Sequence, residues 1–185
     1  KKLAGEIFAA VVVTVFTDLS FSSFHGFLGI TAISPLTSFI VTVFTIILII
    51  NAVNLIDGID GLAASIGIIA SVVFGIFFYL SEDYGYTVMA AALLGALIAF
   101  LRFNVSEGGN KIFMGDTGSL VIGFTLAVLA IRFNEINAKG ESFIDLQSAP
   151  AISIAILIVP LFDTLRVMVL RLHYKQNLFT ADHRH

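Results

Sequence analysis

Long apolar runs alternate with short polar segments along the whole chain. A helix needs about 20 apolar residues to cross the hydrocarbon core of a bilayer. Six runs are candidates for such helices, although the first and the fifth are short: Leu3–Phe16, Pro35–Ile56, Leu62–Leu80, Thr87–Phe103, Ser119–Phe133 and Ala149–Leu172. The pattern predicts an all-α fold, a polytopic membrane helix bundle of about six spans, in a single domain over residues 1–185.

Local signals add detail to three of these helices. Ser34 before Pro35 is a typical helix start, with a serine cap and a proline where no N–H is needed. Pro160 lies inside the sixth run, so it frees the carbonyl of Ile156 and predicts a kink. The fourth run carries small residues at every fourth position, which favours close helix packing: Ala91, Gly95 and Ala99.

Composition excludes several classes of protein. Of the 185 residues, 58% are hydrophobic and 12% are charged, whereas a soluble domain carries about 25% charged residues. The net charge of −3, without a basic stripe, argues against a nucleic-acid partner. Because the chain has no cysteine, disulfides and thiolate metal sites are excluded. We therefore expect a membrane protein.

Lysine and arginine predict the orientation, because they concentrate in cytoplasmic segments. With a cytoplasmic N-terminus and six spans, only Arg132 and Lys139 face outward, and the other basic residues face the cytoplasm: Lys1, Lys2, Arg102, Lys111, Arg166, Arg171, Lys175 and Arg184. We predict a multi-pass protein of the cell (inner) membrane. Its active-site loops, about 51–61, 104–118 and 173–185, are expected to face the cytoplasm.

Two polar turns interrupt the apolar pattern. Residues 19–56 carry no charge, and amides and carboxylates then appear at threefold spacing: Asn51, Asn54, Asp57 and Asp60. The second turn places Asp116 between two glycines. Polar groups at membrane depth must find partners or line a wet cavity. Because both turns fall on the predicted cytoplasmic side, we expect them to meet in one site.

The residue types in the two turns suit a particular chemistry. The predicted third and fifth helices begin at these turns, and a helix N-terminus favours a phosphate through its free N–H groups and partial positive charge. Carboxylate and amide oxygens suit Mg²⁺, which is usually held by one or two carboxylates together with substrate phosphates. Each motif alone is also typical of a structural turn or cap. Their joint placement favours a Mg²⁺–diphosphate site.

Three further features each allow two interpretations. Asp163 and Arg166 form either a structural ion pair, which we favour, or part of the site. Lys111 either binds phosphate or is one of the expected cytoplasmic cations. The C-terminal residues either clamp a diphosphate or form a solvated tail: Asp182, His183, Arg184 and His185.

Four segments together resemble a known family. NAVNLIDGIDGLAAS, FMGDTGSL, VPLFDTLRV and ADHRH resemble the polyprenyl-phosphate N-acetylhexosamine-1-phosphate transferases, glycosyltransferase family 4. The resemblance implies transfer of a sugar-1-phosphate from a UDP-sugar to undecaprenyl phosphate, release of UMP, and Mg²⁺, or Mn²⁺ in its place, as the cofactor. It also implies a paired-aspartate motif before Lys1, so we expect the chain to be a fragment.

The resemblance implies roles for individual residues. Asn54 and Asp116 are expected to bind the metal, and Asp57 and Asp60 to line the nucleotide-sugar site. The expected catalytic residues are Asp57, Asp60 and Asp116. The expected substrate-binding residues are Asn51, Asn54, Asp57, Asp60, Lys111, Phe113, His183, Arg184 and His185, the last of which stands where the family has the first histidine of its histidine motif.

Two branches of this family are candidates for this chain. DHRH and NLIDGIDGLA resemble the N-acetylglucosamine-1-phosphate branch, which serves polysaccharides such as teichoic acid and lipopolysaccharide. Phospho-N-acetylmuramoyl-pentapeptide transferase of peptidoglycan synthesis is the alternative, and an ion-coupled transporter is the alternative from another class. Polar residues at one face, without a visible inverted repeat, weigh against a transporter. The expected partners are a UDP-sugar, a polyprenyl phosphate lipid, the membrane and a second copy of the chain.

Overall fold

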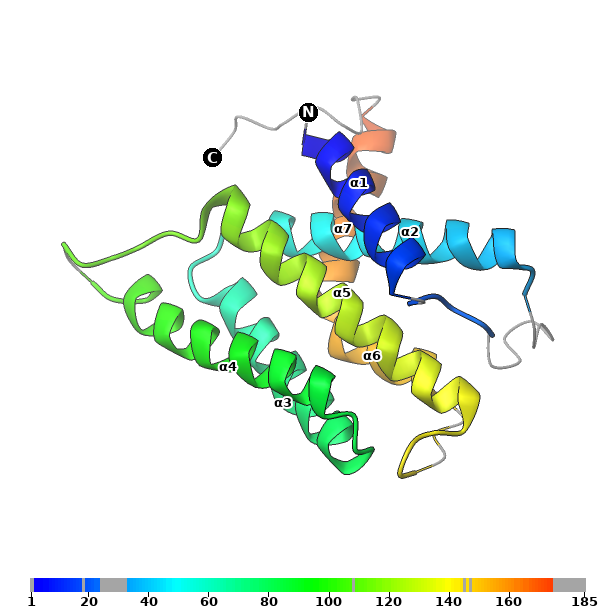
Figure 1. Cartoon of the computed structure of the whole chain (residues 1–185). Helices are drawn as coiled ribbons and strands as arrows, with labels where there is room; N and C mark the ends of the chain where they lie inside the picture. The colour runs from blue at the N-terminus through cyan, green and yellow to red at the C-terminus, as the bar shows by residue number, and fades with distance from the viewer. Residues whose placement is uncertain are drawn as a thin grey trace.

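The chain forms seven α-helices in the residues that the computed structural model describes, which are 2–17, 19–23, 33–107, 109–144, 146 and 148–174. The helices are α1 (Lys2–Phe16), α2 (Pro35–Ile56), α3 (Leu62–Leu80), α4 (Tyr84–Asn104), α5 (Gly115–Lys139), α6 (Ala149–Ile156) and α7 (Ile158–His173). They pack into one helical bundle, with α3 and α4 side by side and α2 crossing α5 (Figure 1). The predicted all-α class is therefore confirmed.

Four of the helices, α2 to α5, are long and apolar enough to cross a membrane. The count within the described residues becomes five if α6 and α7 together make one broken span. Neither count includes α1, whose 15 residues start at Lys2, the first residue that the structure describes.

The predicted bounds of α2 and α3 agree with the observed ones. Ser34 caps α2 as predicted, since its side chain accepts a hydrogen bond from the backbone N–H of Thr37, and Pro35 occupies the first turn. The predicted start of the fifth helix at Ser119 was wrong, because α5 begins at Gly115 and holds Asp116 in its first turn. A carboxylate is favoured in that position by the partial positive charge of the helix N-terminus.

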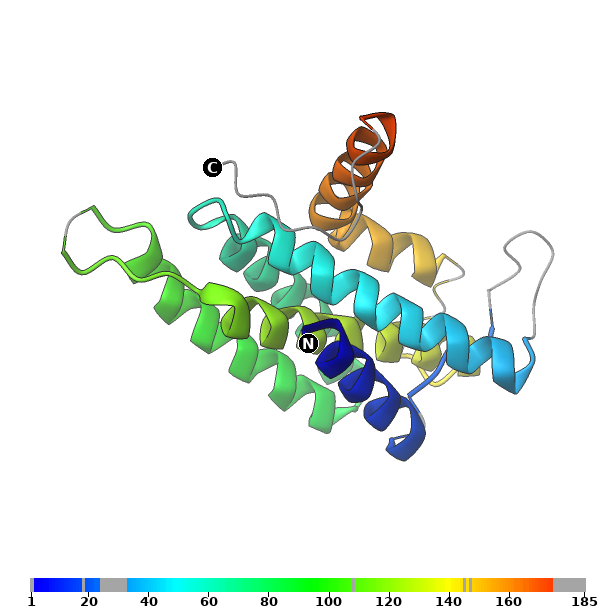
Figure 2. The ribbon, with the colours of Figure 1, turned by 90° about the horizontal axis from the view of Figure 1, so that it is seen from above.

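The predicted sixth helix is broken rather than kinked. α6 ends at Ile156, α7 starts at Ile158, and their axes differ by 75°. Pro160 explains the break, because it cannot donate to the carbonyl of Ile156 and is tolerated only in the first turn of a new helix. As a result α7 leaves α6 at a steep angle and packs on α2, and its C-terminal end projects from the bundle (Figure 2).

Helices approach most closely where a glycine faces a neighbouring helix. A Cβ atom on Gly123 of α5 would lie 2.8 Å from Cα of Ile50 on α2, and one on Gly67 would lie 2.5 Å from a methyl of Leu97. The small-residue row predicted to pack, Ala91, Gly95 and Ala99, is instead exposed in the described structure. The reason is that α4 presents Leu97 rather than that row to α3.

An ion pair fixes the far end of α5. The guanidinium of Arg132 donates from Nε to Oδ2 of Asp83 at 2.8 Å, and its Nη2 forms an ion pair with the same oxygen at 2.8 Å. Its central carbon lies 5.3 Å from the ring centroid of Tyr86. Asp83 stands in the turn between α3 and α4. Since α5 is held there and against α2, its first turn has a defined position at the opposite end of the bundle.

The orientation in the membrane is a testable prediction. Ile59 lies in the turn after α2, which is near the start of α5, and Glu141 lies just beyond the end of α5; both are exposed. Cysteines introduced singly at these two positions of the full-length protein should react with an impermeant thiol reagent from opposite sides. Glu141→Cys should be labelled in intact cells and Ile59→Cys only after permeabilisation; the reverse pattern would contradict the predicted orientation.

Candidate functional site

The first polar turn joins α2 to α3. Asp57 caps the C-terminus of α2, and Gly61 occupies the N-cap of α3 with φ of +74°. A side chain at Gly61 would be strained by this left-handed backbone, and its Cβ would lie 2.8 Å from Cγ1 of Val105. The glycine therefore allows the turn that carries Asp57 and Asp60 to pack directly on the end of α4.

The second polar turn opens α5. Gly115 has φ of +67° and begins the helix, and the side chain of Asp116 is 80% exposed in the first turn. The loops are shorter than the predicted 51–61 and 104–118, because residues 51–56 belong to α2 and 115–118 to α5. Within these two segments, only residues 57–61 and the described part of 105–114 lie outside helices.

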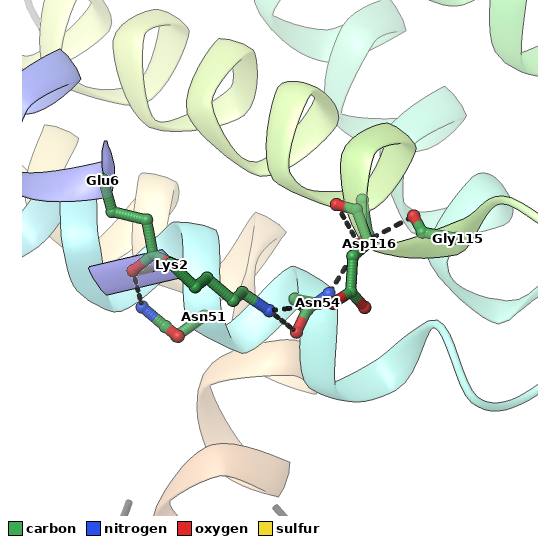
Figure 3. Close-up of polar contacts among 7 residues, drawn as sticks. Lys2, Glu6, Asn51, Asn54, Gly115 and Asp116 are labelled. Carbon is green, nitrogen blue, oxygen red and sulfur yellow. Dashed lines mark hydrogen bonds and ion pairs between the residues drawn. The ribbon is translucent and has the colours of Figure 1, made fainter. Parts of the chain in front are cut away.

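Lys2 of α1 reaches the point where the two turns meet (Figure 3). Its ammonium donates a hydrogen bond to Oδ1 of Asn54, and it lies 3.9 Å from Oδ2 of Asp116. A single positive charge therefore contacts both side chains that were predicted to bind a metal. Lys2 was not predicted to belong to the site, because only the fold brings α1 next to the end of α2.

Asn54 is held in one orientation by a second contact. Its amide nitrogen donates to Oγ of Ser119 at 2.6 Å, so its carbonyl oxygen is left to face Lys2. Ser119 is fully buried, and its hydroxyl also lies 3.2 Å from the carbonyl of Asp116 and 3.3 Å from that of Gly115. Ser119 was also missed, although its place directly after the acidic turn was a usable signal.

Asn51 shares the α2 face of Asn54, as predicted, and that face is covered by α1. The amide nitrogen of Asn51 donates to Oε2 of Glu6 at 2.6 Å and to the carbonyl of Ile47 at 2.9 Å. Glu6 is only 5% exposed, and its other carboxylate oxygen has no partner in the described structure. Asn51 therefore points toward Glu6 rather than toward the acidic turns (Figure 3).

Asp57 and Asp116 lie within electrostatic reach of each other. Partial burial raises the pKa of the Asp57 carboxyl above its usual value, and the negative charge of Asp116 raises this pKa further. Two acids from turns almost 60 positions apart thus share one region, so the prediction that the turns meet agrees with the geometry. Their mutual repulsion makes this region favourable for a cation.

A second ion pair links the two polar segments at their rim. Lys111 contacts Oδ2 of Asp60 through its ammonium at 2.5 Å and lies 5.3 Å from the ring centroid of Phe113. Phe113 is 76% exposed, so the aromatic ring faces outward beside the two charges. The structure therefore groups Asp60, Lys111 and Phe113.

The side chains at this end fit a magnesium ion that keeps much of its water. Among the described residues, no three His, Cys, Asp or Glu side chains lie close enough together to hold a metal by themselves. However, Asn54 and Asp116 already contact one cationic group, Lys2. An amide oxygen plus a carboxylate is a typical partial set for Mg²⁺, which takes its remaining ligands from water and substrate phosphates.

Of two other predicted groups, one forms an ion pair within α7 and the other lies outside the described structure. Asp163 pairs with Arg166 at 3.6 Å along α7, which confirms the predicted ion pair. The tail lies outside the described residues, so the expected roles of its last residues stay predictions: His183, Arg184 and His185.

Comparisons with known proteins agree with a transferase. The family model described as Glycosyl transferase family 4 matches residues 1–134. A phospho-N-acetylmuramoyl-pentapeptide-transferase of Clostridium botulinum (strain Eklund 17B) is 49% identical over 70 residues, which are 38% of this chain and 21% of that protein. A protein of the same name from Clostridium perfringens (strain 13) is 40% identical over 70 residues, which are 38% of this chain and 22% of that protein. Another from Enterococcus hirae is 36% identical over 74 residues, which are 40% of this chain and 22% of that protein.

These relatives correct one expectation from the sequence. The predicted N-acetylglucosamine-1-phosphate branch was wrong, since the relatives carry the name that we had kept as the alternative. The error has a simple cause: a four-residue tail and one turn motif are too short to separate two branches of a single family. The matched segment covers about a fifth of the length of these relatives.

Metal binding by the two acidic turns is testable without any reaction. Replacing Asp116 by asparagine removes one negative charge and one hard oxygen ligand, so we expect the affinity of the purified full-length protein for Mn²⁺ to fall at least about tenfold, or ~1.4 kcal/mol. Mn²⁺ binding would be followed by electron paramagnetic resonance. Asp163→Asn is the matched control, because it makes the same charge change on α7 and should leave the affinity unchanged. Equal affinities for both variants would exclude Asp116 as a ligand.

Proposed function

Because the chain belongs to glycosyl transferase family 4, we propose that its parent protein transfers phospho-N-acetylmuramoyl-pentapeptide from a UDP-linked donor to undecaprenyl phosphate, with release of UMP. The observation that carries the proposal is the 49% identity over 70 residues to an enzyme of that name. The gathering of Asn54, Asp57, Asp60 and Asp116 at one end of an apolar bundle supports it further.

The main obstacle to such a reaction is electrostatic. A phosphate monoester has a second pKa of about 6, so the acceptor lipid is already mostly a dianion at neutral pH and needs little activation. It must instead approach a donor diphosphate that is also negative. Lys2, Lys111 and the N-termini of α3 and α5 lie at this end and would offset that repulsion.

A bound Mg²⁺ ion, held by Asn54 and Asp116, would supply further positive charge where the leaving UMP gains negative charge. The chain's own residues then position the donor. Asp57 and Asp60 would line the nucleotide-sugar site, and Lys111 would bind a phosphate. Phe113 presents an exposed ring beside Lys111, suited to the flat face of a base.

The remaining predicted residues have supporting roles in this proposal. Asn51 is already bonded to Glu6, so we assign it to shaping the α2 face rather than to direct substrate contact. His183, Arg184 and His185 would close over the diphosphate, because histidine and arginine both donate to phosphate oxygens. A site of this kind belongs at the membrane surface, since one substrate is soluble and the other is dissolved in lipid. Its position at one end of the bundle also weighs against a transporter, whose site is expected near the bilayer midplane.

The proposed donor can be tested directly. Purified full-length protein, with Mg²⁺ and undecaprenyl phosphate, should release UMP from UDP-N-acetylmuramoyl-pentapeptide, and Asp57→Asn should lower kcat by roughly 100-fold or more. Asp163→Asn serves again as the charge-matched control and should match the wild type. Release of UMP from UDP-N-acetylglucosamine at a higher kcat/KM than from the pentapeptide donor would contradict the proposal.

A further inference from the structure

Asn104, the last residue of α4, lies between the two polar segments. Its carbonyl oxygen accepts a hydrogen bond from the backbone N–H of Gly61 at 2.6 Å, and its amide nitrogen donates to the carbonyl of Ile112 at 2.9 Å. Gly61 ends the turn that carries Asp57 and Asp60. Ile112 belongs to the segment that leads into Asp116. One side chain thus bonds the backbone of both segments.

This contact has no backbone substitute in the described structure. Among the described residues, no backbone–backbone hydrogen bond joins residues 57–61 to residues 105–114. The side-chain ion pair of Asp60 with Lys111 involves the residues directly preceding Gly61 and Ile112. That ion pair is exposed and therefore worth little on its own, so the buried asparagine is the stronger of the two links.

Burial makes the asparagine contact specific. Only 5% of Asn104 is exposed, and a buried amide that lost either partner would leave an unsatisfied polar group at a cost of about 1–3 kcal/mol. Both polar atoms of this side chain are already bonded to the backbone. Val105 directly follows Asn104, and Gly61 lies close to its side chain. This packing keeps the Asp57–Gly61 turn within reach of the Asn104 amide.

We propose that Asn104 is a positioning residue that sets the spacing between the Asp57–Gly61 turn and the segment leading to Asp116. This inference rests on the proposed function, because the spacing matters when one group of acids holds the donor and the other holds the metal. An error of about 1 Å in such an arrangement can cost roughly 100-fold in rate. The effect of Asn104 should therefore appear in kcat more than in KM.

Two readouts test the proposal in the full-length protein. The first is the dipolar coupling between nitroxide labels on cysteines introduced at Ile59 and Asn110, both exposed and one on each segment. Asn104→Ala should broaden the distribution of label distances. The second is UMP release, where we expect kcat to fall about 10- to 100-fold while KM changes by less than about threefold, or ~0.7 kcal/mol.

Asn134→Ala is the matched control. Asn134 is also a buried asparagine, 3% exposed, and donates to the carbonyl of Ala130 at 2.7 Å and to Oγ of Ser153 at 3.0 Å. It lies at the other end of the bundle, so its loss should weaken the fold without changing the label distances or kcat. Asn104→Asp is the second variant, to be used if Asn104→Ala does not fold. An aspartate keeps the side-chain volume and the oxygen that accepts from Gly61, but it loses the N–H that donates to Ile112.

The outcomes separate the possible errors. Wild-type label distances in an Asn104 variant, or a loss of kcat in Asn134→Ala as large as in Asn104→Ala, would overturn the positioning role. If the wild-type protein released no UMP from the proposed donor, the proposed function would fail instead. The label distances would still decide whether Asn104 holds the two segments together.

Discussion

The negative charges of Asp57 and Asp116 repel each other at the polar end of the bundle, and the rest of the site depends on how this repulsion is offset. Asp57 and Asp116 come from different turns, and their proximity raises the pKa of the Asp57 carboxyl. Positive charge is needed to keep them together. Lys2 supplies it at Asn54 and Asp116, and Lys111 supplies it at Asp60. The site therefore depends on α1 and on residues 105–114 as much as on the acidic motifs themselves.

The apolar part of the bundle gives this polar end a firm support. Gly123 lets α5 approach the backbone of α2, and the pair of Arg132 with Asp83 fixes the opposite end of α5. Because α5 is held at both places, its first turn presents Asp116 beside Asn54 rather than at a variable distance. Packing far from the polar groups thus decides where a metal and a diphosphate would lie.

Local signals in the sequence predicted much of the fold and less of the site. The bounds of α2 and α3 followed from the Ser34 cap and the apolar pattern, whereas the break at Leu157 could be placed only within a few residues of Pro160. The acidic turns were found by spacing alone. Lys2 and Asn104 were not assigned to the site, since each bonds one partner more than 40 positions away and only tertiary structure makes these contacts. The choice between family branches failed because it rested on motifs of a few residues.

A structure of the full-length protein with Mn²⁺ and UDP-N-acetylmuramoyl-pentapeptide, with anomalous scattering used to locate the metal, tests the central claim most directly. The account predicts a metal peak in contact with Asn54 and Asp116, and the donor diphosphate between this metal and Lys111. Asp57 and Asp60 should lie along the nucleotide-sugar. A donor bound at another surface, or a metal peak that touches neither Asn54 nor Asp116, would contradict the claim that the two acidic turns form one site.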